Sequence, residues 1–250
     1  PWKINESIYH LMMQVWEEGL DLGESVLPDR KDIPVPPKPH DIETNKEARK
    51  EWSQKAGAVH NKNAELSSLR IQAAKILWVA QKFKDEETIY FPHQLDFRGR
   101  LYAVPSFLQP QGCDAAKSLL VFAQGKRLTD SSMKWLLIHA ANCFGEDKCS
   151  FEARVQWAKM NLKRIVACSS DPLGERWWTG ADKPWQFLAA CMEIDAVLRN
   201  PDHVSCLPVS VDGSCNGLQN FSAMLRDPIG GKAVNLIPQD TPNDIYERVA

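Results

Sequence analysis

The sequence lacks several features that would place it in a specialised class of protein. No apolar run approaches the roughly 20 residues that a membrane-spanning helix needs, and no secretory signal stands at its start. The seven cysteines include no Cys-x-x-Cys pair, and the six histidines show no metal-ligand spacing. We therefore expect no disulfide framework and no zinc site, and we expect reduced thiols in a cytoplasm.

The chain also lacks a large net charge, since its formal total is −2. A polyanionic partner would therefore have to be bound by a local basic cluster. One such cluster lies on the polar face of a helix predicted over 44–84, and it comprises Lys46, Arg49, Lys50, Lys55, Lys62, Arg70, Lys75, Lys82 and Lys84. This face is either a solvated helix surface or a surface that follows a phosphate backbone, where each cation releases counterions.

The periodicity of apolar residues predicts an α+β fold that is predominantly helical. The predicted helices cover residues 4–18, 44–84, 131–143, 151–169, 184–199 and 214–225. The predicted strands cover 89–92, 101–104 and 205–211, and the proline-rich segment 32–39 is expected to run extended. Because the chain begins at Pro1 and ends within a helical pattern over 240–250, we expect a fragment of a longer protein.

The most informative stretch runs Val209-Ser210-Val211-Asp212-Gly213-Ser214-Cys215-Asn216-Gly217-Leu218-Gln219. It is typical of a short strand, then a carboxylate, then a helix that begins at Ser214 as its N-cap. A carboxylate at the exposed end of a strand can hold a divalent cation, and the Gly213 carbonyl would add a second oxygen to Asp212. The alternative is a hairpin, because Asp-Gly between apolar residues is also a common turn signal.

Three further residues, two in this stretch and one shortly after it, are candidates for binding a nucleotide. Gly217 lies one turn into the predicted helix, where glycine costs about 1 kcal/mol relative to alanine. Close approach of a nucleotide would compensate for this cost, and so would tight packing of another helix. Gln219 follows on the same helix, and Arg226 can either reach a phosphate or cap the helix C-terminus.

A second candidate site is the predicted turn Asp96-Phe97-Arg98-Gly99-Arg100. Arg98 and Arg100 stand on either side of Gly99, and a turn there can point their guanidinium groups at phosphates or ribose hydroxyls. Alternatively, an ion pair between Asp96 and one of these arginines only fixes the turn. Lys117 lies on the first turns of a helix that follows a loop at 109–113, and alone it indicates little.

Together with the tracts 221–227 and 230–236, these motifs resemble the single-subunit DNA-directed RNA polymerases of T-odd bacteriophages and mitochondria. The resemblance covers the whole chain, and the phage enzymes look closer. It implies a right-hand polymerase, in which residues 1–86 form the helical approach and the thumb. Residues 87–238 would be the first half of the palm, with short antiparallel strands plus helices, and residues 239–250 would begin the fingers.

The resemblance implies that ribonucleoside triphosphates are added to an RNA 3′-hydroxyl on a DNA template by a two-metal mechanism with Mg²⁺. Asp212 would be one of two metal-binding aspartates, with the Gly213 carbonyl beside it. Arg100 would contact nucleic acid, and Gly217 would line the ribose of the incoming nucleotide. The second aspartate and the fingers lie outside this chain, so we expect the fragment to be inactive alone. The motif departs from the commonest phage form at Asn216 and Asn220.

The partners implied are the DNA template and promoter, the RNA product and ribonucleoside triphosphates, for a monomer without membrane attachment in the cytoplasm of an infected bacterium. The mitochondrial matrix is the alternative location. One alternative function is a family A DNA polymerase, but that family follows its metal aspartate with a Tyr-Ser-Gln-Ile-Glu type of sequence. The other is a non-catalytic nucleic-acid-binding module, in which the basic helix binds and Asp212 is structural.

Overall fold

The computed structural model describes residues 1–23, 26–211 and 213–249. The chain divides into two compact units, Pro1–Gln124 and Gly125–Ala250. This division differs from the expected boundaries after residues 86 and 238, which stay predictions. Within the described residues, no helix combines the length and the apolar character that crossing a membrane requires.

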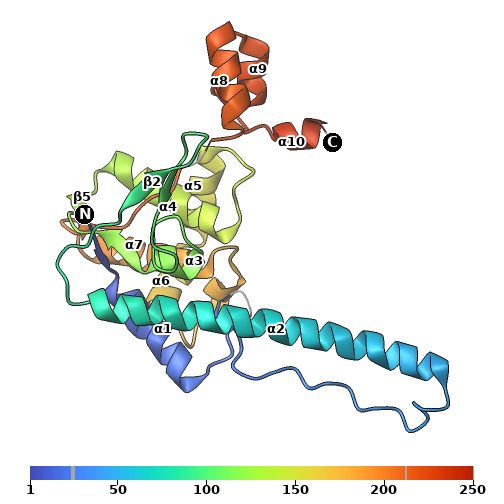
Figure 1. The fold of residues 1–250 in the computed structure, drawn as a ribbon. Helices are drawn as coiled ribbons and strands as arrows, with labels where there is room; N and C mark the ends of the chain where they lie inside the picture. The colour runs from blue at the N-terminus through green and yellow to red at the C-terminus, as the bar shows by residue number, and fades with distance from the viewer. Residues whose placement is uncertain (24–25, 212, 250) are drawn as a thin grey trace. The chain divides into compact units, whose positions relative to one another are not determined.

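The first unit is built from three helices and three short stretches of antiparallel pairing (Figure 1). Its helices are α1 (Glu6–Glu18), α2 (Lys46–Phe83) and α3 (Asp114–Ser118). Strand β1 (Trp2–Ile4) pairs with β4 (Leu120–Phe122), and β2 (His93–Leu95) pairs with β3 (Leu101–Ala103) as a hairpin. An isolated bridge joins Trp2 to Ile89.

Local sequence explains where the two long helices of this unit begin. The Asn5 side chain accepts a hydrogen bond from the N–H of Ile8, and the Asn45 side chain accepts from those of Glu47 and Ala48. The apolar stripe expected on α2 is confirmed in part. Leu66, Ala73, Ile76, Leu77 and Ala80 are buried, whereas Leu69 and Phe83 are exposed. The helical content and the antiparallel pairs agree with the predicted fold class.

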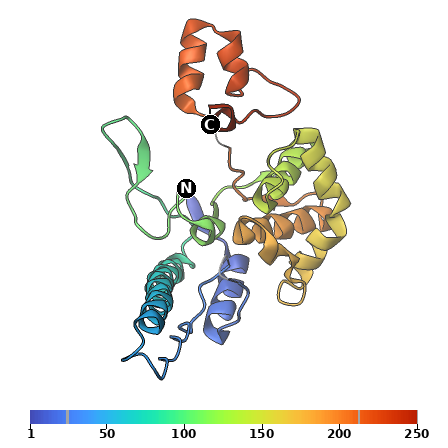
Figure 2. The same cartoon turned by 90° about the vertical axis from the view of Figure 1, so that its right-hand side faces the viewer.

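The second unit contains a helical bundle and, after it, a helical hairpin (Figure 2). The bundle consists of α4 (Asp130–Phe144), α5 (Phe151–Met160), α6 (Leu162–Ser170), the 3₁₀ turn η1 (Arg176–Gly180) and α7 (Pro184–Arg199). A short pair joins β5 (Lys126–Arg127) to β6 (Val204–Ser205). The remaining helices are α8 (Asn216–Leu225), α9 (Pro228–Ala233) and α10 (Ile245–Val249).

Large buried side chains fill the bundle, and one buried carboxylate links two of its helices. Trp178, Trp185 and Phe187 are fully buried. Asp195 on α7 accepts a hydrogen bond from Ser169 on α6 and pairs with Arg199 one turn further along α7. A buried carboxylate with two partners of this kind avoids most of the penalty of an isolated buried charge.

Four sequence-based boundaries differ from the observed ones. The first strand of the hairpin is 93–95 rather than 89–92, because Pro92 has no N–H to donate to a ladder. The helix predicted over 151–169 is interrupted at Asn161, whose ψ of 8° departs from helical geometry.

The strand predicted over 205–211 is reduced to Val204–Ser205, because its partner β5 is only two residues long. The last helix of the motif begins at Asn216 rather than at Ser214. Cys215 is its N-cap, and the Ser214 hydroxyl instead accepts a hydrogen bond from Asn235. The prediction that Ser214 caps this helix is therefore wrong.

The fold makes one testable prediction about pH. His139 of α4 is 3% exposed, and burial, aided by the nearby charge of Lys183, lowers its pKa from 6.5 to about 4. Since the folded pKa lies below the unfolded one, the unfolded chain binds more protons between these values. The free energy of unfolding should therefore fall by about 3 kcal/mol as the pH drops from 6.5 to 4.

Urea unfolding of the parent and of His139→Leu across this pH range measures the effect. The variant should lose this part of the pH dependence, whatever its stability at neutral pH. An identical pH dependence in both proteins would contradict the assignment.

Candidate functional site

The turn of the β2–β3 hairpin is fixed by Asp96. Its carboxylate accepts hydrogen bonds from the N–H groups of Arg98 and Arg100, each 2.9 Å away. The N–H of Gly99 donates to the Asp96 carbonyl, and Gly99 adopts a φ of 75°, which glycine tolerates best. The Arg100 N–H, followed by the Arg98 side chain, holds the pKa of Asp96 below its usual value.

The two arginines of this turn are in different situations. The Arg98 guanidinium pairs with the Asp96 carboxylate at 3.1 Å and lies over the Phe97 ring, 5.4 Å from its centroid. The Arg100 side chain is exposed, and among the described residues it has no hydrogen bond or ion pair. The ion-pair alternative thus describes Arg98, whereas Arg100 keeps its five donors for another partner.

Two other residues of the first unit bear on the predicted nucleic-acid contacts. Phe97 at the tip of the turn is 96% exposed. Lys117 lies in the short helix α3 and is partly buried, and its ammonium makes no hydrogen bond or ion pair within the described part of the chain. A free guanidinium and a free ammonium are the groups that phosphates attract.

In the second unit, the candidate site follows Asp212, which itself lies outside the described residues. The segment after it is braced by amide side chains. The Asn235 amide donates to the Ser214 hydroxyl at 2.9 Å and to the Asn243 carbonyl at 2.8 Å, and it accepts from the Asn243 N–H at 2.7 Å. Gln219 of α8 donates to the Val234 carbonyl at 2.7 Å, at the end of α9.

Backbone strain concentrates in the same segment. Three non-glycine residues have a positive φ among the described residues, namely Cys215 at 75°, Arg226 at 53° and Asn235 at 57°. They stand at the start of α8, at its end and after α9. Such conformations cost about 1–2 kcal/mol for most residues and are often found at functional sites. Sequence reasoning missed Asn235, although asparagine tolerates this conformation better than other non-glycine residues.

Two amide oxygens lie close to Gly213. A Cβ placed on Gly213 would lie 2.4 Å from Asn216 Oδ1 and 3.0 Å from Gln219 Oε1, so two amide oxygens converge on this glycine. Oxygen is the ligand that Mg²⁺ prefers. The described residues contain no cluster of three His, Cys, Asp or Glu side chains that would complete a metal site by themselves.

The other predicted nucleotide-binding residues of α8 differ in their surroundings. A Cβ on Gly217 would meet no atom within 4 Å, so the packing of another described helix does not explain this glycine. The Gln219 amide donates to the Val234 carbonyl, whereas the Arg226 side chain is exposed and has no polar partner among the described residues. Arg226 caps α8 through its backbone N–H, which leaves its guanidinium free.

Comparison with known proteins gives a consistent result over the whole chain. A family model described as DNA-dependent RNA polymerase matches residues 126–250. The chain is 42% identical to the DNA-directed RNA polymerase of Enterobacteria phage K11 and 41% identical to T7 RNA polymerase of Escherichia phage T7, with 100% of the chain aligned in each case. It is 41% identical to the mitochondrial DNA-directed RNA polymerase 1B of Nicotiana tabacum, again over 100% of the chain.

The chain spans only part of these relatives, 28% of the phage proteins and 25% of the tobacco protein. The identities scarcely separate phage from mitochondrial members. They favour the RNA polymerase resemblance over the family A DNA polymerase and over the non-catalytic binding module.

The geometry of the hairpin predicts the effect of removing Asp96. In Asp96→Ala, the N–H groups of Arg98 and Arg100 lose their acceptor, so their hydrogen exchange should accelerate by about tenfold or more. Asp85→Ala is the matched control, because its carboxylate pairs with Lys84 outside the hairpin. Site-resolved hydrogen exchange measures both variants. Unchanged exchange at Arg100 in Asp96→Ala would show that the carboxylate does not fix the turn.

Proposed function

The chain belongs to the family of DNA-dependent RNA polymerases, and from this premise we propose that it forms part of an enzyme that copies DNA into RNA. The observation that carries the proposal is the alignment of the entire chain with single-subunit RNA polymerases. In the proposed reaction, the RNA 3′-hydroxyl attacks the α-phosphorus of a ribonucleoside triphosphate, and pyrophosphate leaves. The chain would supply only part of the active site, since it spans about a quarter of its relatives' length.

We assign the metal-binding role to Asp212 and to the carbonyl of Gly213. Bound Mg²⁺ would lower the charge repulsion between the attacking hydroxyl and the phosphates. The convergence of Asn216 Oδ1 and Gln219 Oε1 beside Gly213 supports an oxygen-lined position there. The brace formed by Asn235 would hold this segment still, because Ser214 and Asn243 are both tied to it.

The free cations are assigned to nucleic acid or to the triphosphate. Arg100 and Lys117 would contact the template–product duplex, and Arg226 would contact a phosphate, because the side chains of all three have no hydrogen bond or ion pair among the described residues. Arg98 would act as a positioning residue, since its guanidinium is engaged with Asp96. Gly217 would line the ribose of the incoming nucleotide, and Gln219 would position the segment that carries Gly213.

The proposed architecture is a right-hand polymerase with the thumb in residues 1–86, the first half of the palm in 87–238 and the start of the fingers in 239–250. Its partners would be promoter and template DNA, RNA and ribonucleoside triphosphates, for a monomeric enzyme. The cytoplasm of an infected bacterium and the mitochondrial matrix both fit the relatives.

The central test uses the complete polymerase that contains this chain. Asp212→Asn should lower ribonucleotide incorporation on a primed DNA template by about 100-fold or more, because a neutral amide binds Mg²⁺ weakly. Asp227→Asn is the matched control at the other end of α8. Its carboxylate caps α9 by accepting from the N–H of Ile229, and asparagine caps equally well.

Three outcomes are distinguishable in this experiment. Loss of incorporation in Asp212→Asn with template binding retained supports the metal-binding role. Undiminished incorporation removes Asp212 from the active site. A parent protein that binds DNA but incorporates nothing would favour the binding module.

The substitution Gly217→Ala should affect helix stability and nucleotide binding in opposite ways. Since a Cβ there meets no atom within 4 Å, Gly217→Ala should raise helix stability by up to about 1 kcal/mol. The same methyl group should raise the KM for ribonucleoside triphosphates if the ribose lies against this position.

Gly57→Ala is the matched control, because Gly57 lies within α2 and its Cβ position is equally open. It should stabilise its helix without changing the KM. Steady-state kinetics and thermal unfolding measure the two effects. An unchanged KM in Gly217→Ala would exclude close contact with the nucleotide.

A further inference from the structure

One half of α2 is poorly supported by the rest of its unit. The helix has 38 residues, but of its buried residues only Ala56 lies before Leu66. The segment 46–64 would extend for about 28 Å at 1.5 Å per residue. A largely solvated helix of this length is marginally stable by itself. Another element must therefore hold it.

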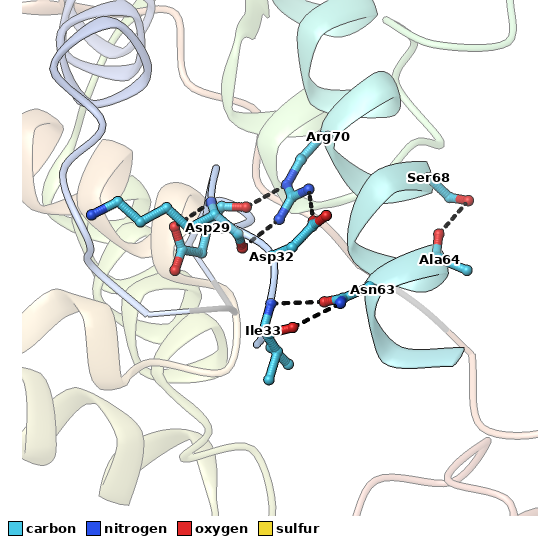
Figure 3. A network of polar contacts seen from close by, with 8 residues as sticks. Asp29, Asp32, Ile33, Asn63, Ala64, Ser68 and Arg70 are labelled. Carbon is cyan, nitrogen blue, oxygen red and sulfur yellow. Dashed lines mark hydrogen bonds and ion pairs between the residues drawn. The ribbon is translucent and has the colours of Figure 1, made fainter. Parts of the chain in front are cut away.

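That element is the segment 29–38, which we call the strap. It is tied to α2 at three positions, Arg70, Asn63 and Trp52, and Figure 3 shows the first two. The Trp52 indole N–H donates to the Pro36 carbonyl at 2.9 Å, and the Lys38 ammonium lies 5.6 Å from the centroid of the Trp52 ring. The ties therefore extend from the middle of α2 toward its N-terminus.

Arg70 makes the densest of these contacts. Its guanidinium donates to the carbonyls of Asp29 and Lys31, and to the Asp32 carboxylate at 2.7 Å (Figure 3). The Arg70 side chain is only 19% exposed. A planar fork with five donors can reach three acceptors at once, whereas the single ammonium of lysine cannot reproduce this geometry.

Asn63 holds the backbone of Ile33 as a neighbouring strand would. Its Oδ1 accepts from the Ile33 N–H at 2.8 Å, and its amide donates to the Ile33 carbonyl at 2.9 Å (Figure 3). Prolines at 34, 36 and 37 restrict the rest of the strap to extended conformations. A segment that is extended before it docks loses little conformational entropy on docking.

These contacts change the interpretation of the basic face of α2. The charge of Arg70 is used within the first unit, and Lys55, Lys62 and Lys84 pair with carboxylates. Among the described residues, the exposed cations without polar partners on this helix include Lys46, Arg49 and Lys50. All three lie on the half of α2 that the strap supports.

We infer that the strap keeps residues 46–64 of α2 helical, and that Arg70 and Asn63 are positioning residues for the cations at its N-terminal end. The inference rests on the proposed function, in which α2 belongs to the thumb beside the template–product duplex. Loss of the strap would let this half of the helix open, and the polymerase would then leave its template sooner. The rate of each nucleotide addition would stay the same, because the α2 residues that the strap contacts, Trp52, Asn63 and Arg70, are not among those assigned to the metal or the nucleotide.

The experiment uses the complete polymerase with Arg70→Lys, Asn63→Ala and Lys50→Gln. Arg70→Lys keeps the charge but loses the fork, whereas Lys50→Gln removes an exposed cation without touching the strap. Hydrogen exchange over 29–38 and 46–64 should accelerate at least tenfold in Arg70→Lys and Asn63→Ala, with α1 unchanged. Lys50→Gln should exchange like the parent.

Transcription from preformed complexes gives the functional readout. In Arg70→Lys and Asn63→Ala, the fraction of complexes that reach the template end should fall severalfold at an unchanged rate per nucleotide. The dependence of template binding on salt should become weaker in Arg70→Lys, because an opened helix no longer positions its N-terminal cations against phosphates.

Two results would overturn the inference. One is parent-like exchange over 29–38 and 46–64 in both strap variants. The other is a loss of processivity in Lys50→Gln but not in Arg70→Lys, which would assign the effect to charge alone. Because the exchange measurement needs no activity, a parent that incorporates no nucleotide would overturn the proposed function and leave the test of the strap intact.

Discussion

The geometry of the segment after Asp212 depends on one amide side chain, that of Asn235. It holds Ser214 at the start of α8 and Asn243 before α10, while its own backbone adopts a left-handed conformation. A carboxylate that binds a cation cannot at the same time be neutralised by internal partners. The surrounding backbone must therefore be fixed by other residues, and neutral amides do this without adding a competing charge. Gln219 has the same role at the end of α9.

In the β2–β3 hairpin of the first unit, too, some polar groups fix the backbone while another has no partner. Asp96 and Arg98 satisfy each other and the backbone of the turn, which leaves the Arg100 guanidinium unpaired among the described residues. Along α2, Arg70 is occupied by the strap while cations nearer the N-terminus are exposed. In both places one set of side chains fixes the backbone, and the side chain of a neighbouring cation stays exposed. This division of roles is what a surface for a phosphate backbone requires.

Much of this fold could be predicted from the sequence, because apolar residues at helical spacing mark α1, α2, α4 and α7. The hairpin turn followed from the glycine at its αL position. The strand before Asp212 was predicted too long, because its apolar pattern does not reveal that β5 offers only two residues of pairing. The roles of Asn235 and Arg70 depend on contacts across 8 to 41 residues of sequence, which no local pattern encodes.

The most direct test of the account is to locate the bound cation in the complete polymerase. Fe²⁺ bound in place of Mg²⁺ reacts with added hydrogen peroxide to give hydroxyl radicals that cut the backbone next to the metal site. We expect cleavage between Val211 and Ser214, and excess Mg²⁺ should suppress it. Cleavage elsewhere in the polymerase, with none in this segment, would contradict the assignment of Asp212 and Gly213 as metal ligands.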